Sequence, residues 1–279
     1  MANDKKTVRK IIDAVKASGR TSLTAPEGKQ VCDAYGIPVP KEGGATTAAA
    51  AAKLASGMGY PVVLKIVSPD ILHKTEAGGV LVGVKSAAEV KAGFTKILAN
   101  AKKYNRKAQI LGVQVQQMVG GGQEVIIGAV TDPSFGKLVA FGLGGVLVEV
   151  MKDITFRLAP ATKDDALSML DGIAAAEMLK GVRGADPVNR TALAAVIRNV
   201  SQLVADFPEI AEMDLNPVFA SKAGAIAADV RIVLDFHPAP ARYRPKHEDI
   251  VRDMNRIMKP DAVAVIGASG EVGKIGNSV

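Results

Sequence analysis

The sequence has no tryptophan, few other aromatic residues and a single cysteine. Aromatic residues make up 4% of the 279 residues, and Cys32 is the only thiol. One cysteine excludes an intrachain disulfide framework and a zinc cluster built from cysteines. No apolar run approaches the roughly 18 residues that cross a bilayer, and residues 1–20 lack the apolar core of a secretory signal. We therefore expect a cytoplasmic protein with no membrane partner.

The chain also lacks a basic folded body, although its formal net charge is +7. Residues 1–20 hold six lysines and arginines against two acidic residues, and residues 236–260 hold six against three. A nucleic-acid-binding protein usually carries its basic patch on the folded body. The excess charge here lies near the ends and aromatic residues are scarce, so we do not expect a nucleic-acid partner.

The apolar pattern predicts an α+β protein with mixed or antiparallel sheets. The expected helices cover residues 4–18, 24–35, 46–56, 86–103, 163–180 and 190–206, and the expected strands cover 61–67, 80–84, 112–119, 124–130, 138–142, 213–219 and 225–229. Short turn segments join several of these strands as hairpins, which argues against a single wound parallel sheet.

The ends of the chain are expected to differ from its middle. Residues 1–24 are interpreted as an N-terminal helix and 25–235 as the main domain, with a mobile lid at about 60–130 that would exclude water. Three prolines within 236–247 indicate a linker, which is assigned to 236–260. Residues 261–279 contain an expected strand at 263–266 and then three spaced glycines, so they resemble the incomplete start of another domain.

Lys65 lies in the middle of the apolar segment PVVLKIV. Burying an ammonium group is costly unless an anion neutralises it. Two interpretations follow: Lys65 binds a phosphate, or it lies on an edge strand and its amine reaches water. The apolar residues on both sides of Lys65 favour the first.

A polar loop, His73-Lys74-Thr75-Glu76-Ala77-Gly78-Gly79, follows this strand. Paired glycines such as Gly78 and Gly79 let backbone N–H groups approach phosphates closely. An imidazole such as that of His73 is a competent nucleophile or proton carrier near neutral pH. The alternative is that His73 is an ordinary exposed side chain.

Acidic and amide side chains gather late in the chain. Glu212, Asp214 and Asn216 would share one face of a strand, and Asp229 is expected opposite them on the next strand of a hairpin. Carboxylate and amide oxygens suit Mg²⁺, which takes few protein ligands and shares the rest with phosphates and water. A solvated polar hairpin is the alternative.

Two further segments are weaker candidates. The strand end Gln116-Gln117-Met118-Val119 could offer backbone groups to an adenine edge, and Glu124 could accept ribose hydroxyls, although an ordinary hairpin fits equally well. The glycines at 142, 144 and 145 could form a phosphate-facing loop or a bulged hairpin.

Together these segments resemble the ATP-grasp domain of ADP-forming acyl-CoA synthetases, relatives of succinyl-CoA synthetase. The matching stretches, spread over about residues 25–235, are PVVLKIVSPDILHKTEAGGV, the run E-x-x-I-G-A-x-x-D-P-x-F-G from Glu124, FGLGGVLVEVMKDITFRLAP, and EMDLNPV followed by ADVRIVLD. The resemblance implies an ATP-grasp fold, in which two α/β subdomains clasp ATP. The run Gly267-Ala268-Ser269 is similar to the opening of that family's Rossmann-like CoA-binding domain.

The resemblance also implies roles for individual residues. His73 would be the shuttle histidine that carries a phosphoryl group, and Glu212 could orient it. The implied cofactors are ATP or ADP and Mg²⁺. Nucleotide contacts would come from Lys65, Lys74, Gly78, Gly79, Gln116, Gln117, Met118, Val119, Glu124 and Arg231, and the metal ligands would be Asp214, Asn216 and Asp229.

The family's CoA site and first phosphohistidine lie in domains that this chain lacks or only begins. The resemblance therefore implies a fragment or subunit that binds nucleotide and Mg²⁺ alone but meets CoA only in the complete enzyme. We expect an exposed apolar surface for the missing half, or self-association into a homo-oligomer.

Two other functions share this fold. One is a regulatory ligand-binding module like that of bacterial lysine acetyltransferases, against which the intact Lys65, His73, Asp214, Asn216 and Asp229 argue. The other is an amide-forming ligase, which the HKTEAGG loop disfavours because those members need no phosphohistidine shuttle.

Overall fold

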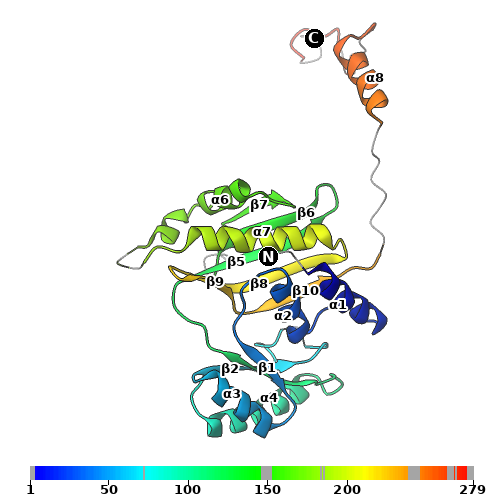
Figure 1. The fold of residues 1–279 in the computed structure, drawn as a ribbon. Coiled ribbons are helices and arrows are strands. Elements are labelled where there is room, and N and C mark those ends of the chain that lie inside the picture. The colour runs from blue at the N-terminus through cyan, green and yellow to red at the C-terminus, as the bar shows by residue number, and fades with distance from the viewer. Residues whose placement is uncertain are drawn as a thin grey trace. The chain divides into compact units, whose positions relative to one another are not determined.

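The computed structural model describes residues 4–71, 73–145, 153–182, 184, 186–237, 246–262, 267 and 269–274. The chain divides into two compact units, Met1–His237 and Pro238–Val279. Within its described residues, the first unit contains two antiparallel sheets, each with its own hydrophobic core (Figure 1). This arrangement agrees with the expected α+β class.

The smaller sheet has the strand order β1-β4-β2-β3. Its strands are β1 (Glu42–Ala45), β2 (Val62–Val67), β3 (Val80–Val84) and β4 (Gly112–Gln117), and the helices α3 (Ala48–Met58) and α4 (Ala87–Tyr104) pack against it. Apolar residues of β2 and β4, such as Leu64 and Val115, are fully buried with Phe94 and Ile97 of α4. Burial of these side chains is the main force that holds the helices on the sheet.

The larger sheet has the order β10-β8-β5-β6-β7, with β9 paired to β8. Its strands are β5 (Gln123–Asp132), β6 (Gly136–Leu143), β7 (Ile154–Leu158), β8 (Ile210–Ser221), β9 (Gly224–Ala227) and β10 (Val230–Leu234). The helices α6 (Lys163–Asp171) and α7 (Arg190–Asp206) pack on it, with the 3₁₀ helix η1 (Ala176–Lys180) following α6.

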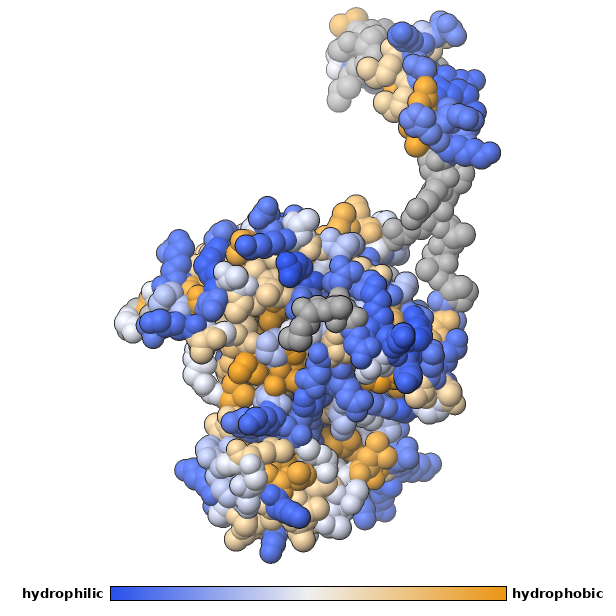
Figure 2. Space-filling model, in the orientation of Figure 1, coloured by the Kyte–Doolittle hydropathy of each residue, from blue (hydrophilic) through white to orange (hydrophobic). Residues whose placement is uncertain are grey.

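The N-terminal helices α1 (Lys5–Ala17) and α2 (Ala25–Ala34) belong to the core of the larger sheet. Val8, Ile12 and Val15 recur at helical spacing and are buried in that core together with Val31 of α2. Hydrophilic side chains dominate the surface over α1 (Figure 2), as an amphipathic helix requires. Thr24 and Glu27 form a capping box at the start of α2, which is the start signal that the sequence predicts.

Three strands and one helix break differ from the sequence prediction. Strands β1, β7 and β10 were not expected, and the helix expected over 163–180 ends at Gly172. The Asp153 carboxylate accepts the N–H groups of Ala174 and Ala175, at 2.7 and 2.9 Å. These bonds satisfy backbone donors outside a helix, so the chain turns before η1 begins.

The expected domain ranges stay predictions, and the two sheets give the observed grouping of the elements. The smaller sheet begins at β1, before residue 60, and ends with β4, because β5 pairs with β6 and β8 of the larger sheet. The expected linker over 236–260 contains a helix, α8 (His247–Met258), which exposes Ile250 and Ile257 and has no buried residue. The strand expected at 263–266 lies outside the described residues. Among the helices that the structure describes, none is long and apolar enough to span a membrane.

Candidate functional site

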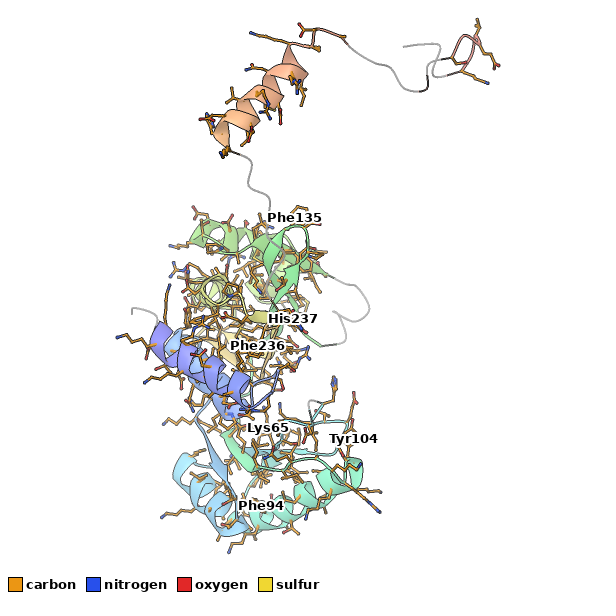
Figure 3. All side chains as sticks on the ribbon, turned by 90° about the vertical axis from the view of Figure 1, so that its right-hand side faces the viewer. Lys65, Phe94, Tyr104, Phe135, Phe236 and His237 are labelled. Atoms are coloured by element: carbon orange, nitrogen blue, oxygen red, sulfur yellow. The ribbon has the colours of Figure 1, made fainter. Side chains whose placement is uncertain are left out.

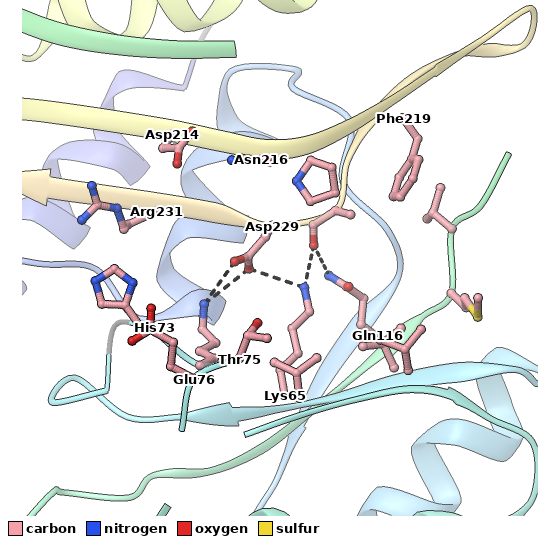
Figure 4. Close-up of a pocket in the computed structure, with 18 residues that line it drawn as sticks. Lys65, His73, Thr75, Glu76, Gln116, Asp214, Asn216, Phe219, Asp229 and Arg231 are labelled. Carbon is pink, nitrogen blue, oxygen red and sulfur yellow. Dashed lines mark hydrogen bonds and ion pairs between the residues drawn. The ribbon is translucent and has the colours of Figure 1, made fainter. Parts of the chain in front are cut away.

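A cavity of about 540 Å³ lies between the two sheets (Figure 4). Both sheets and the loop after β2 contribute to its wall. The lining residues are Val63, Lys65, His73, Lys74, Thr75, Glu76, Val80, Val82, Gln116, Met118, Val119, Asp214, Asn216, Pro217, Phe219, Ala228, Asp229 and Arg231. The early basic segment and the late acidic segment therefore meet in one place, as the sequence hypothesis requires.

Lys65 projects from β2 of the smaller sheet towards the larger one (Figure 3). Lys65 is only 8% exposed. Its Nζ donates to the carbonyl oxygen of Ala228 at 2.7 Å and lies 3.4 Å from Asp229 Oδ1. Burial lowers the pKa of Lys65, while the carboxylate of Asp229 opposes that shift. Because β2 lies between β4 and β3, the edge-strand interpretation of Lys65 is wrong.

Four successive residues of the loop after β2, His73 to Glu76, line the cavity. Lys74 Nζ lies 3.4 Å from both carboxylate oxygens of Asp229. His73 is exposed at the cavity wall, and its ring makes no hydrogen bond to any described residue. An imidazole with both nitrogens uncommitted is available to an incoming group.

Gly78 and Gly79 do not line the cavity, in contrast to the prediction that they approach a phosphate. Their N–H groups donate to the carbonyl oxygens of Thr75 and Lys74, at 2.9 and 2.8 Å. A Cβ on Gly79 would stand 2.5 Å from Ile66 Cγ2, and Gly78 has φ +60°. These glycines close the turn and pack it against β2, so their role in the structure is conformational.

The acidic side chains come from β8 and from the turn between β9 and β10. Asp214 and Asn216 lie on β8, two residues apart, and both face the cavity. Asp229 was expected on a strand of the hairpin, but it lies between β9, which pairs with the end of β8, and β10, which pairs with its beginning. The turn nevertheless brings Asp229 into the same cavity.

The charges around Asp214 favour a bound cation. Burial raises the pKa of Asp214; Arg231, its partner on β10, opposes this shift, and Glu212 and Asp229 add to it. A divalent cation would relieve the repulsion between these carboxylates. Within the described residues no group of three His, Cys, Asp or Glu side chains could hold a metal by itself. The carboxylates of Asp214 and Asp229 and the amide of Asn216 are oxygen donors, and such a set fits Mg²⁺ because this ion completes its shell with water and phosphate oxygens.

Glu212 has a different partner from the one predicted. Its carboxylate forms an ion pair with Arg231, and Arg231 lines the cavity whereas Glu212 does not. The expectation that Glu212 orients His73 is therefore not supported by the observed contacts.

The last two residues of β4 and the two that follow it contribute three of the four predicted residues to the cavity. Gln116, Met118 and Val119 line it, whereas Gln117 is exposed on the other side of the strand. The Gln116 side chain is not free, because its Nε2 donates to Glu42 Oε2 at 2.9 Å and to Ala228 O at 3.1 Å. The sequence analysis missed Glu42, which belongs to the unpredicted strand β1.

Glu124 lies outside the cavity lining. It is the second residue of β5 and lies opposite Phe219 of β8, and its carbonyl oxygen accepts the N–H of Gly144 at 2.8 Å. Gly142 lies on β6 and pairs with Ile154 of β7, which agrees with the hairpin interpretation at this glycine. The segment 146–152 lies outside the described residues.

Comparison with known proteins identifies the family to which this fold belongs. A model of the ATP-grasp domain family matches residues 14–234. The chain belongs to the ATP-grasp family. Its similarity extends to the subunit beta of the ADP-forming acetate–CoA ligase I of Pyrococcus furiosus, which is 47% identical over 226 residues that cover 81% of this chain and 97% of the relative.

Other ATP-grasp relatives are longer or have been solved with ligands. The ADP-forming 4-hydroxybutyrate–CoA ligase of Nitrosopumilus maritimus is 48% identical over 83% of this chain, which spans only 33% of that relative. Acetyl-coenzyme A synthetase 1 of Ca. Korarchaeum cryptofilum, in complex with coenzyme A and Ca-AMPCP, has a TM-score of 0.80 and 41% identity over 81% of this chain and 99% of that one. Its complex with coenzyme A and Mg-AMPPCP has a TM-score of 0.72 and 38% identity over 82% of this chain and 100% of that one.

This ATP-grasp chain therefore matches the beta-subunit-like portion of ADP-forming CoA ligases. The relatives give no support to the regulatory-module alternative or to an amide-forming ligase.

Proposed function

We propose that this chain is the ATP- or ADP-binding and phosphoryl-transfer portion of an ADP-forming acyl-CoA synthetase, which converts an acid, CoA and ATP to acyl-CoA, ADP and phosphate. The observation that carries the proposal is the meeting of Lys65 and Lys74 with Asp229 across the cavity, beside Asp214 and Asn216. The ligase relatives and the nucleotide complexes of the Korarchaeum enzyme support the same function.

The two lysines would bind the phosphates of the nucleotide. In the structure both lysines lie 3.4 Å from the carboxylate of Asp229, whose side chain is 38% exposed and so accessible to a metal. Mg²⁺ held by Asp214, Asn216 and Asp229 would neutralise the phosphate charge. Lys65 and Lys74 would then exchange the carboxylate for phosphate oxygens, so no lysine is left unpaired. Such catalysis consists mainly of positioning and charge stabilisation.

The apolar end of the cavity would receive the base. Val63, Val82, Met118 and Val119 are apolar residues of the cavity lining, and the backbone that follows β4 would offer groups to an adenine edge. Arg231 would support the phosphates while Glu212 balances its charge. A ribose contact of Glu124 remains a prediction.

His73 would carry the phosphoryl group. Its ring stands at the cavity wall, two residues before Thr75 and next to Lys74, with no competing hydrogen bond from a described residue. A ring nitrogen would form a P–N bond as the bond from the γ-phosphorus to the ADP oxygen breaks, and ADP leaves. In a second step, the phosphoryl group would be transferred from His73 to a histidine of the partner portion, and this transfer would regenerate free His73.

A partner would supply the CoA site and that second histidine. The Pyrococcus relative is a beta subunit, and the Nitrosopumilus ligase is about three times as long as the matched segment. The described surface includes an apolar groove lined by Phe135, Leu138, Phe156 and Leu158, which agrees with the expected apolar patch. Alone, the chain should bind nucleotide and Mg²⁺ but form no acyl-CoA. Light scattering would show whether the chain alone forms the homo-oligomer that the sequence analysis gives as an alternative.

Isothermal titration of ATP with and without Mg²⁺ tests the proposal. Wild type should bind ATP in a magnesium-dependent manner, and Asp214→Ala and Asp229→Ala should each weaken that binding at least about tenfold, or about 1.4 kcal/mol. Glu177→Ala is a matched control, because Glu177 is exposed and pairs only with Lys180 among the described residues. Unchanged affinity in both aspartate variants would contradict the proposed site.

A further inference from the structure

A series of hydrogen bonds at the cavity wall connects the two sheets. The carbonyl oxygen of Ala228 accepts two donors from the smaller sheet, Lys65 Nζ at 2.7 Å and Gln116 Nε2 at 3.1 Å. Gln116 Nε2 also donates to Glu42 Oε2 at 2.9 Å. Lys65, Gln116 and Glu42 come from the three adjacent strands β2, β4 and β1, whereas Ala228 belongs to the turn before β10.

These hydrogen bonds link two sheets that otherwise have separate hydrophobic cores. The buried residues packed with β1–β4 form one cluster and those packed with β5–β10 form another. The position of Lys65 relative to Asp229 therefore depends on contacts at the boundary. Gln116 is 5% exposed and Lys65 8%, so these contacts are screened little by water.

Glu42 fixes the side chain of Gln116. Glu42 and Gln116 lie directly opposite each other in the pairing of β1 with β4. Without an acceptor at position 42, the Gln116 amide could rotate away from Ala228, and Lys65 would be the remaining link to that carbonyl. The neighbouring Gln114 Oε1 is buried without a donor beside a space of about 10 Å³, enough for roughly one water molecule. An amide or protonated carboxyl at position 42 could supply a donor to Gln114.

We propose that Glu42 is a positioning residue for nucleotide binding, which holds Gln116 so that Gln116 and Lys65 together anchor the Ala228 carbonyl. This inference rests on the proposed function. On this view Lys65 would give up Asp229 to a metal and still point at the phosphates, because its bond to Ala228, 2.7 Å in this structure, would be kept. Glu42 does not touch the nucleotide; it acts through Gln116.

Titration of Mg·ATP and of AMP into four proteins tests the inference. We expect Glu42→Ala to weaken Mg·ATP binding about tenfold and AMP binding less than about twofold, because Lys65, then the single remaining anchor of the Ala228 carbonyl, is held less firmly and serves the outer phosphates. Glu42→Gln should stay within about twofold of wild type for both ligands, since its amide oxygen still accepts from Gln116. The control Glu177→Ala should match wild type. Thermal unfolding without nucleotide shows whether each variant folds.

If Glu42→Ala does not fold, Glu42→Met keeps the volume but removes the acceptor and should show the same loss. Equal affinity of Glu42→Ala and wild type for Mg·ATP, with Asp229→Ala impaired, would overturn the positioning role and leave the proposed function intact. The positioning role would also be overturned if Glu42→Gln bound Mg·ATP as weakly as Glu42→Ala does. The same holds if Glu42→Ala weakened the binding of Mg·ATP and of AMP equally. If wild type itself does not bind Mg·ATP, both the proposed function and this inference fail.

Discussion

The two sheets contribute opposite charges to one cavity. The smaller sheet and its loop provide Lys65, Lys74 and His73, and the larger sheet provides Asp214 and Asp229. Each sheet has a complete hydrophobic core, so neither needs the other for its packing. The site, by contrast, exists only where they meet. A phosphate with its metal can lie between the two sheets, where the lysines pair with the phosphate and the aspartates pair with the metal. Without ligand, the lysines and Asp229 pair with each other.

The two sides also differ in solvation. The Lys65 side chain is 10% exposed and that of Asp229 is 38% exposed. The lysine therefore bears the cost of desolvation, which lowers its pKa, while the aspartate keeps access to water and to an arriving cation. We infer that the basic side is preorganised and the acidic side adjusts on binding.

Replacing His73 with alanine should produce the largest effect. His73→Ala is expected to bind Mg·ATP within about twofold of wild type, because the ring contacts no other described site residue, yet to lose phosphoryl relay in the enzyme reconstituted with its partner portion. Binding is measured by titration and relay by transfer of labelled phosphate from ATP. Full relay activity in His73→Ala would exclude the shuttle role.

Replacing Lys65 with methionine should separate binding from stability. Lys65→Met is expected to weaken Mg·ATP binding about 30-fold, on the order of 2 kcal/mol, because a desolvated phosphate partner is lost. Its melting temperature should equal or exceed that of wild type, since an apolar group of similar volume avoids the cost of burying a charge. A loss of both stability and affinity would show that Lys65 acts through the fold.

Replacing Gly79 with alanine should affect the smaller sheet more than the site. The added Cβ would clash with Ile66, so Gly79→Ala should lower the free energy of unfolding by about 1–3 kcal/mol in urea titrations. Once folded, it should bind Mg·ATP as wild type does. A large loss of affinity without a loss of stability would restore the predicted phosphate contact.

Replacing Asp214 with asparagine should have the smallest effect on the free protein, and that effect should depend on pH. The pKa of Asp214 in the folded state is raised, mainly by burial, so the stability it contributes below its unfolded pKa is lost as pH rises through the folded value. Without metal, Asp214→Asn should therefore match wild type near about pH 3 and be slightly more stable near about pH 7. Urea unfolding at both pH values measures the difference, and a variant less stable at neutral pH would contradict the assigned burial cost.

Much of the fold could be predicted from local patterns. The strand over 80–84 and the helix over 190–206 have the predicted bounds, because the spacing of their apolar residues marks them. Strand β1 could not be predicted, since its sequence EGGA has little strand preference and forms by pairing with β4, about 70 residues later. Tertiary pairing decides such segments, as it decides the break after α6.

The site shows the same division. Alternation along a strand correctly placed Asp214 and Asn216 on one face. It could not show that Gly78 and Gly79 spend their N–H groups inside the turn, or that Arg231 takes Glu212 as its partner. Glu42 had no local signal, because its function depends on Gln116 and on a carbonyl of the other sheet.

The most direct test is a crystal structure of the chain with Mg²⁺ and a non-hydrolysable ATP analogue. The account predicts a metal at about 2.0–2.1 Å from oxygens of Asp214 and Asp229. It also predicts that Lys65 Nζ leaves Asp229 for a phosphate while it keeps Ala228. A nucleotide bound outside this cavity, or a metal that touches neither aspartate, would contradict it.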